Sequence, residues 1–203
     1  MKNQNTQNPE NNAANAANET KKAHAITLMI IDESGSMMKL KRATEESHMG
    51  ILQKIKLECE EMPHLNQYAN TWLFEGIHLR ECQPLTKIEA NDELKPITLI
   101  PKGSTPLFDA IGKACTQLEM LMNNLKFPAS DTIVNVALFT DGEENSSTMF
   151  TQSEIKRLIT RLKTQGWTFD YYGTDTSVEE MKERLAFDGG MKIRSEEHRL
   201  NSS

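Results

Sequence analysis

The sequence has few of the residues that crosslink small proteins. Cysteine occurs only three times in 203 residues, at Cys59, Cys82 and Cys115. An odd number of widely spaced cysteines argues against a disulfide framework and against a cysteine-based zinc site, so we expect buried free thiols. The five histidines also lack the paired spacing of a histidine metal site. A metal site in this chain would therefore use oxygen ligands.

The sequence also lacks long apolar runs and basic clusters. No apolar stretch approaches the length that spans a membrane, and the residues after Met1 do not form the apolar segment of a secretory signal. The formal net charge is −6, and lysines and arginines are scattered rather than clustered, so there is no basic footprint for nucleic acid. These absences predict a soluble, cytoplasmic protein with a protein or metal partner, and no binding to membranes or nucleic acids.

The first 22 residues contain no Val, Ile, Leu, Phe, Trp or Tyr and are dominated by Asn, Gln and Ala. Such a segment cannot bury enough apolar surface to offset its conformational entropy. We therefore expect residues 1–23 to be a disordered tail, residues 24–195 to form one domain, and residues 196–203 to be a flexible tail. The length suits a single α/β domain.

Apolar runs alternate with helical patterns along the middle of the chain. Residues 25–31, 133–139 and 167–172 are apolar enough for buried strands, and residues 71–74, 77–79, 94–100 and 191–194 are weaker extended candidates. Apolar residues at helical spacing predict helices over 40–62 and 107–125, and capping boxes that begin at Thr151 and Ser177 predict two more. This alternation predicts an α/β fold with a mainly parallel sheet covered by helices on both faces.

Polar side chains suited to a hard cation follow the ends of two predicted strands. Asp32, Ser34 and Ser36 come directly after the first buried strand, and Asp141 follows another. Thr105 precedes a helix and is expected at the same edge of the sheet, where ligands bind in open α/β folds. Mg²⁺ prefers carboxylate, hydroxyl and water oxygens in octahedral array, and Mn²⁺ accepts the same ligands. The sequence therefore predicts a magnesium site, with manganese as an alternative.

These segments resemble the metal-ion-dependent adhesion site (MIDAS) of von Willebrand factor A (vWA) domains. The resemblance rests on Asp32-x-Ser34-x-Ser36, on Thr105 within residues 103–111, and on Thr140-Asp141-Gly142, and it extends over about residues 24–187. The chain is similar to the small stand-alone bacterial members of that family. The resemblance implies a Rossmann-like vWA fold and metal ligation by Asp32, Ser34, Ser36, Thr105 and Asp141, in part through water.

In that family an Asp or Glu of a partner protein completes the metal shell. The resemblance therefore implies a docking site with no catalytic function, in which metal and partner bind cooperatively. Met37 and Met38 stand where some adhesive receptors carry acidic residues for an adjacent second metal. We therefore predict no adjacent metal site in this chain.

Several of these residues also have plain structural interpretations. Thr105 is a natural helix N-cap with Pro106 at the first helical position, and Asp109 suits the positive end of the helix dipole. Glu143 and Glu144 are interpreted as a solvated acidic loop. The aromatic residues on predicted strands are expected to pack in the core.

Two other functions remain as alternatives. A metal-dependent hydrolase or phosphatase would use Asp32 or Asp141 to activate water or accept a phosphoryl group. Against this, the sequence has neither a Gly-x-x-x-x-Gly-Lys phosphate loop nor a Gly-x-Ser-x-Gly nucleophile elbow, so no enzyme activity is expected. A regulatory subunit with a vestigial metal site is the second alternative.

Overall fold

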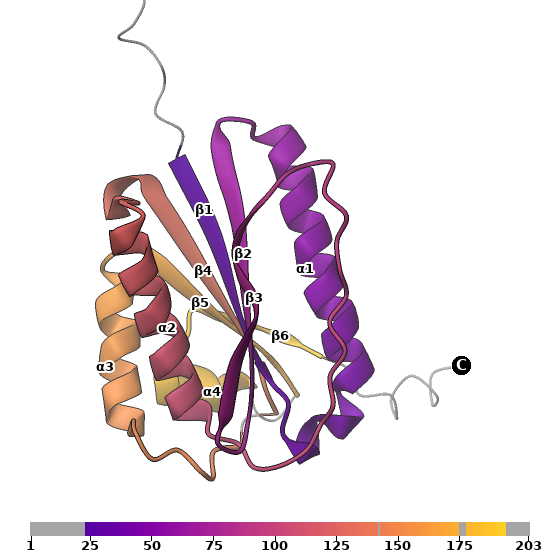
Figure 1. Cartoon of the computed structure of the whole chain (residues 1–203). Helices are drawn as coiled ribbons and strands as arrows, with labels where there is room; N and C mark the ends of the chain where they lie inside the picture. The colour runs from indigo at the N-terminus through magenta and orange to yellow at the C-terminus, as the bar shows by residue number, and fades with distance from the viewer. Residues whose placement is uncertain (1–22, 142, 175–177, 194–203) are drawn as a thin grey trace, which may run out of the picture.

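A computed structural model describes residues 23–141, 143–174 and 178–193, with the side chain of Val178 not described. The described chain is an α/β protein with one six-stranded sheet in the order β3-β2-β1-β4-β5-β6 (Figure 1). All neighbouring strands are parallel except β2 and β3, which are antiparallel. The predicted fold class is confirmed.

The strands are β1 (Ala23–Asp32), β2 (Leu65–Glu75), β3 (His78–Ile88), β4 (Thr132–Phe139), β5 (Trp167–Gly173) and β6 (Gly189–Lys192). The helices are α1 (Lys41–Glu61), α2 (Leu107–Asn124), α3 (Gln152–Lys163) and α4 (Val178–Leu185), with short 3₁₀ helices η2 (Gly35–Lys39) and η3 (Ala129–Asp131). None of the described helices is both long and apolar enough to cross a membrane.

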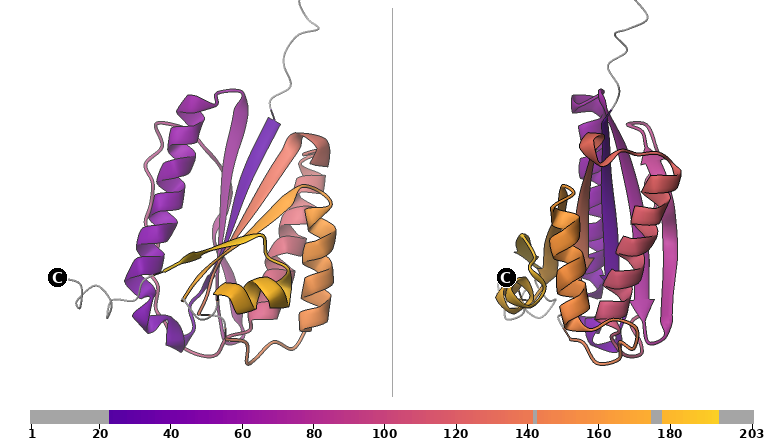
Figure 2. Two further views of the ribbon diagram at one scale, coloured as in Figure 1. Left: turned by 180° about the vertical axis from the view of Figure 1, so that it is seen from behind. Right: turned by 90° about the vertical axis from the view of Figure 1, so that its left-hand side faces the viewer.

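The helices cover the two faces of the sheet and divide the core into two layers (Figure 2). Along β1, Leu28 and Ile30 contact the layer under α2, α3 and α4, whereas Met29 and Ile31 contact the layer under α1. Alternate strand residues point to opposite faces, so a strand covered on both sides is apolar at nearly every position. This explains why the apolar runs in the sequence predicted β1 and the inner half of β4.

Both ends of α3 follow their sequence signals. Thr151 and Glu154 form the predicted capping box at the start of α3, in which each side chain accepts a hydrogen bond from the backbone of the other. Gly166, with φ of 89°, makes the turn from α3 into β5. Ser177, predicted to cap α4, lies outside the described residues.

Three sequence expectations are wrong. Residues 94–100 form no strand, because their backbone groups bond to side chains instead: the amide of Leu99 donates to Glu45 Oε1 at 2.8 Å, and that of Ile100 to Glu33 Oε1 at 2.7 Å. The strands predicted at 71–74 and 77–79 are too short: β2 and β3 are each 11 residues long, and Ile77 lies in the turn between them. Among the cysteines only Cys115 is buried, since Cys59 is half-buried and Cys82 is exposed on the edge strand.

His48 of α1 is a buried neutral base in the core. It has no exposed surface, its Nε2 lies 3.3 Å from Thr71 Oγ1, and its Nδ1 has no hydrogen-bond partner. Burial lowers the pKa of His48 to about 4 from the ordinary 6.5. The unfolded chain therefore binds a proton at His48 at a pH where the folded chain does not.

We expect the free energy of unfolding contributed by this site to fall by about 2–3 kcal/mol as the pH drops from 7 towards 4. The measurement is urea unfolding at pH 7 and pH 4.5 of the wild type and His48→Gln, whose curves should converge at the lower pH. His64→Gln, at an exposed histidine, is the control. Identical pH dependence in the wild type and His48→Gln would contradict this prediction.

Candidate metal site at the carboxyl edge of the sheet

The turn after β1 brings three of the predicted ligands together. Asp32 is the last residue of β1, fully buried, and its Oδ1 accepts a hydrogen bond of 2.7 Å from the backbone amide of Ser34. This local bond folds the chain back on itself before η2 begins. As a result the hydroxyl oxygens of Ser34 and Ser36 lie 3.2 Å apart.

The chemistry and spacing of these donors fit a hard cation. Neighbouring oxygens around an octahedral Mg²⁺ lie roughly 3 Å apart, because each Mg–O distance is about 2.1 Å. The 3.2 Å separation of the two serine hydroxyls is close to this value. Among the described residues no three His, Cys, Asp or Glu side chains are grouped to hold a metal. Of the five predicted metal ligands, only Asp32 and Asp141 belong to these residue types. The other three are hydroxyl side chains.

Thr140 holds the second oxygen of Asp32 and was missed by the sequence analysis. Its hydroxyl donates a hydrogen bond of 2.6 Å to Asp32 Oδ2, and its side chain is fully buried. The Tyr171 hydroxyl donates to the Thr140 carbonyl at 2.8 Å and so fixes this residue from β5. The available signal was a hydroxyl residue directly before Asp141, at the end of a strand that pairs with β1.

Asp32 and Asp141 place uncompensated negative charge at this edge. Burial raises the pKa of Asp32 to about 6, although hydrogen bonds from Ser34 and Thr140 oppose the rise, and the charge of Asp141 adds to it. No ion pair found within the described part of the chain involves either carboxylate. A cation between the two side chains would supply the missing positive charge.

The loop before α2 is bonded to the turn after β1. The amide of Lys102 donates to the Glu33 carbonyl at 2.9 Å, and the amide of Gly35 donates to the Gly103 carbonyl at 3.2 Å. Gly103 has φ of 72°, and a β-carbon at this position would lie 2.5 Å from Glu75 Oε2. The positive φ therefore favours glycine here, two residues before Thr105, which is buried at this edge.

Thr105 is not the N-cap of α2, which corrects the structural interpretation of this residue. The N-cap is Pro106, and the first-turn amides are capped from another loop. The amide of Phe108 donates to Glu144 Oε2 at 2.9 Å, and that of Asp109 donates to the Ser147 hydroxyl at 3.1 Å. The Thr105 hydroxyl therefore does not serve as this helix's cap.

Glu144 is a structural anchor, so its interpretation as a solvated acidic residue is wrong. Besides capping α2, its carboxylate accepts the amides of Ser146 and Ser147 at 3.0 and 2.8 Å. The negative charge also lies at the positive end of the α2 dipole. The neighbouring Glu143 is exposed, as expected.

We expect Glu144→Ala to lower the free energy of unfolding by about 2–3 kcal/mol, because it leaves several backbone amides without acceptors. Glu143→Ala is the matched control and should change stability by less than about 0.5 kcal/mol. Chemical denaturation of both variants measures the difference. Equal effects of the two substitutions would mean that Glu144 does not anchor the loop.

The loop that carries Asp141 is bonded to Thr105. The amide of Thr105 donates to Asn145 Oδ1 at 2.8 Å, and the amide of Asn145 donates to the Thr105 carbonyl at 3.1 Å. The structure thus joins all three predicted segments. Asp32, Ser34 and Ser36 are in contact, and the charge of Asp141 acts on Asp32. Thr105 is bonded to the loop at Asn145, and Lys102 and Gly103 just before it are bonded to the turn after β1.

The sequence matches no family model and no curated protein. Solved structures do match. The SpRpn10 VWA domain is 13% identical with a TM-score of 0.54, and the match covers 89% of this chain and 95% of that one. The pilus adhesin SpaC of Lactobacillus rhamnosus GG, in its open conformation, is 14% identical with a TM-score of 0.55 over 91% of this chain and 30% of that one.

The manganese-loaded TRAP protein of Plasmodium vivax is 12% identical with a TM-score of 0.50, and the match covers 90% of this chain and 72% of that one. These likenesses place the chain in a structural class: it has an α/β fold like that of vWA domains. At such low identity they establish the fold alone. The part of the sequence-based resemblance that concerns the fold is therefore confirmed.

Proposed function

We propose that this chain is a non-enzymatic, metal-dependent protein-interaction module. In this proposal Asp32, Ser34, Ser36, Thr105 and Asp141 hold Mg²⁺ directly or through water, and an Asp or Glu of a partner protein completes the coordination. The observation that carries the proposal is the fully buried Asp32 carboxylate, which feels the charge of Asp141 and has no ion pair with any cationic side chain in the described part of the chain.

The composition of the ligand set supports recognition of an acidic partner. The hydroxyls of Ser34, Ser36 and Thr105 are neutral, so a divalent cation held there would be only partly neutralised by the protein. A partner carboxylate would then bind strongly in a contact that excludes water. Manganese suits the same oxygen donors, and one neighbour in fold, TRAP, was crystallised manganese-loaded.

The groups that donate hydrogen bonds to Asp32 offer no second acid or base for hydrolysis. Hydrolysis by a metal-activated water also needs a base or a charged group positioned at the reacting atoms. Within the described residues, the hydrogen bonds to Asp32 come from a backbone amide and from a hydroxyl. Neither donor is a general acid or base at neutral pH.

The test is affinity capture with the full chain as bait, in Mg²⁺ and in EDTA. The bait variants are Ser34→Ala, which removes a proposed ligand, and Ser130→Ala, which removes an exposed serine from the η3 turn as the matched control. We expect a captured protein that is retained by the wild type and Ser130→Ala in Mg²⁺. The same protein should be lost with Ser34→Ala and with EDTA.

Two outcomes would contradict the proposal. Capture that is unaffected by both EDTA and Ser34→Ala would favour the alternative of a vestigial metal site and a different binding face. Hydrolysis of p-nitrophenyl phosphate that requires both the metal and Asp32 would favour the enzyme alternative.

A further inference from the structure

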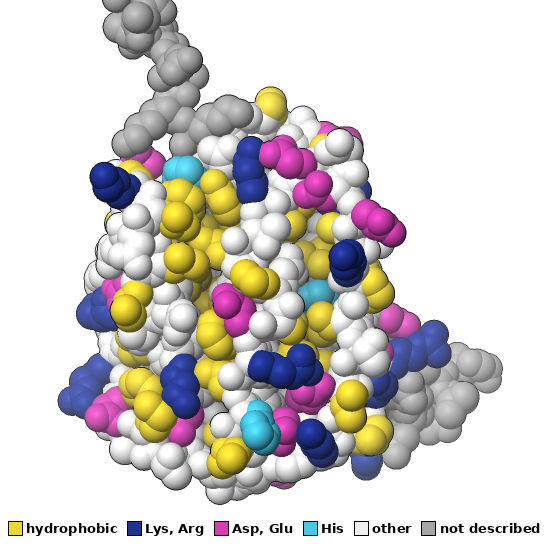
Figure 3. Space-filling view, viewed as in Figure 1, with side chains coloured by type: hydrophobic (Ala, Val, Ile, Leu, Met, Phe, Trp, Pro, Cys, Tyr) yellow, Lys and Arg dark blue, Asp and Glu magenta, His cyan; other side chains and the backbone are white. Residues whose placement is uncertain are grey.

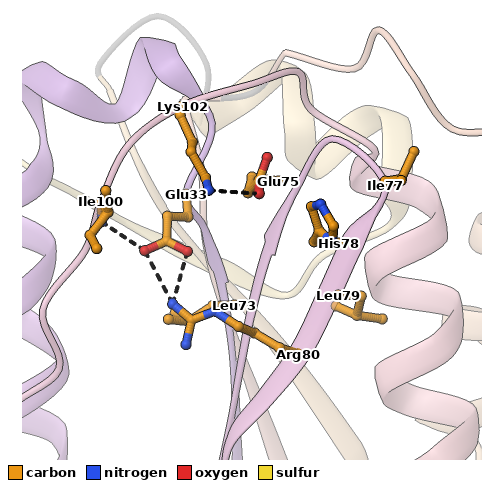
Figure 4. A pocket seen from close by; sticks show the side chains of 9 residues that line it. All are labelled: Glu33, Leu73, Glu75, Ile77, His78, Leu79, Arg80, Ile100 and Lys102. Atoms are coloured by element: carbon orange, nitrogen blue, oxygen red, sulfur yellow. Dashed lines mark hydrogen bonds and ion pairs between the residues drawn. The ribbon is translucent and has the colours of Figure 1, made fainter.

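A cavity of about 490 Å³ lies beside the candidate metal site. Its walls are the tip of the β2–β3 hairpin and the segment that leads to Gly103, and Figure 4 shows two carboxylates, Glu33 and Glu75, in it. Figure 3 shows acidic, basic and apolar side chains intermixed on the lower part of this face. Recognition in the cavity would therefore depend on individual groups and not on a uniform charged patch.

Glu33 is fully satisfied by its protein partners. Its carboxylate accepts hydrogen bonds of 3.0 and 3.3 Å from Arg80 Nη2 and one of 2.7 Å from the amide of Ile100. These bonds hold β3 and the segment at Ile100, which lies between β3 and α2, against the turn after β1. Glu33 therefore belongs to the framework of the cavity.

Glu75 is the less tightly held carboxylate of the cavity. The residue is 8% exposed, and among the described residues its one ion pair is with the Lys102 ammonium, whose Nζ lies 3.6 Å from Oε1. A charge-assisted hydrogen bond between such groups is about 2.7–2.9 Å long. The Lys102 side chain is 64% exposed and comes from a loop, so it can swing away from Glu75. A largely buried carboxylate that is held by one long ion pair can exchange this partner for a better-placed cation.

The cavity is adjacent to the proposed ligands of the metal. Glu75 Oε2 lies against Gly103, whose carbonyl accepts the amide of Gly35 within the motif turn. Ile77 and Ile100, which line the same cavity, are 92% and 66% exposed, so they present apolar surface at its mouth. One short partner segment could therefore contact both the metal and the cavity.

We infer that the cavity binds the basic side chain, Arg or Lys, of the same partner segment whose carboxylate binds the metal. The incoming cation replaces Lys102 at Glu75, and its aliphatic stem packs between Ile77 and Ile100. The partner segment thus carries an acidic and a basic residue close together. This inference rests on the proposed function, because the metal-bound carboxylate places the basic side chain over the cavity.

The experiment uses the full chain in Mg²⁺ and a displayed library of nonapeptides with a fixed central Asp and random flanks. We expect selected peptides to be enriched in Arg or Lys at one fixed offset from the Asp. One selected peptide is then compared with a copy in which norleucine replaces the basic residue. On the wild type the basic peptide should bind about tenfold more tightly, the value of one charge-assisted contact.

Two variants test the assignment to Glu75. On Glu75→Gln, which preserves the shape of the side chain, the affinity ratio of the two peptides should fall close to one. Lys102→Met, at an exposed position, should strengthen binding of the basic peptide severalfold because it frees Glu75. Weaker binding of the basic peptide to Lys102→Met would overturn the inference, since Lys102 would then be contacting the acidic group.

The outcomes separate this inference from the proposed function. Selected peptides that need both Mg²⁺ and the central Asp but show no preference for a basic residue would refute the inference alone. Failure to select any peptide whose binding needs Mg²⁺ and Asp would count against both. A basic preference that persists on Glu75→Gln would place the basic side chain elsewhere.

Discussion

Asp32→Asn should fold normally and lose at least about 100-fold in affinity for Mg²⁺ or Mn²⁺. The asparagine carbonyl can accept the Ser34 amide in place of Asp32 Oδ1, and its NH₂ group can donate to the Thr140 hydroxyl in place of Oδ2. The substitution therefore removes the charge and keeps both contacts, with the direction of the bond to Thr140 reversed. In the absence of metal the variant should be at least as stable as the wild type, because it no longer buries a carboxylate.

The measurement is a Mn²⁺ titration followed by electron paramagnetic resonance, together with the shift in melting temperature on adding Mg²⁺. Metal that binds only the folded state stabilises it, so the wild type should gain in melting temperature and Asp32→Asn should not. Glu60→Gln removes an exposed charge from the end of α1 and is the control. Equal metal affinity in the wild type and Asp32→Asn would rule out Asp32 as part of the site.

Asp109→Ala should produce the largest loss of stability of the substitutions considered, about 3–5 kcal/mol. The residue is 8% exposed, and its carboxylate accepts the amides of Thr148, Met149 and Phe150, each at 2.9 Å. Without it these amides lack acceptors at the end of the loop that starts at Asp141. The melting temperature should fall by about 10 °C, measured by circular dichroism.

Glu154→Ala is the matched control, because Glu154 also accepts a backbone amide at a helix start but in an exposed position. It should cost much less stability than Asp109→Ala, because an exposed amide can bond to water instead. Burial by itself would raise the pKa of Asp109, but the amides of Thr148, Phe150 and Met149, together with Lys113, hold it below its ordinary value. Its contribution is thus present above that ordinary value and is lost in acid. A loss for Asp109→Ala no larger than that for Glu154→Ala would contradict this account.

The parts of the site predicted from the sequence are those encoded locally. Apolar residues before Asp32 and Asp141 marked strands covered on both faces, and strand polarity then placed both side chains at one edge. The alternating hydroxyls of Ser34 and Ser36 were readable because a short turn brings near neighbours together. Hydrogen bonds within a few residues of sequence, such as the capping box of Thr151 and Glu154, were predicted for the same reason.

The parts that were missed depend on pairs far apart in the sequence. Thr140 bonds to Asp32 across 108 residues, and Glu144 caps a helix whose first turn lies 36 residues earlier. Asp109 was expected to act through the helix dipole, but it serves as the acceptor for the loop at Thr148. Periodicity and spacing in the sequence do not specify which distant residue a polar side chain will bond to. The sequence around an acidic residue that anchors a distant loop looks the same as the sequence around a solvated one.

The direction of β1 determines how the molecule can be attached to a surface or to another protein. Its ten residues from Ala23 to Asp32 run along the full length of the strand, about 30 Å at the usual rise per residue. The two ends of β1 therefore lie at opposite ends of the sheet. Ala23 thus lies at the end of the sheet opposite Asp32 (Figure 1). A tag, bead or fusion partner attached there would leave the edge with Asp32, Ser34 and Ser36 facing outward.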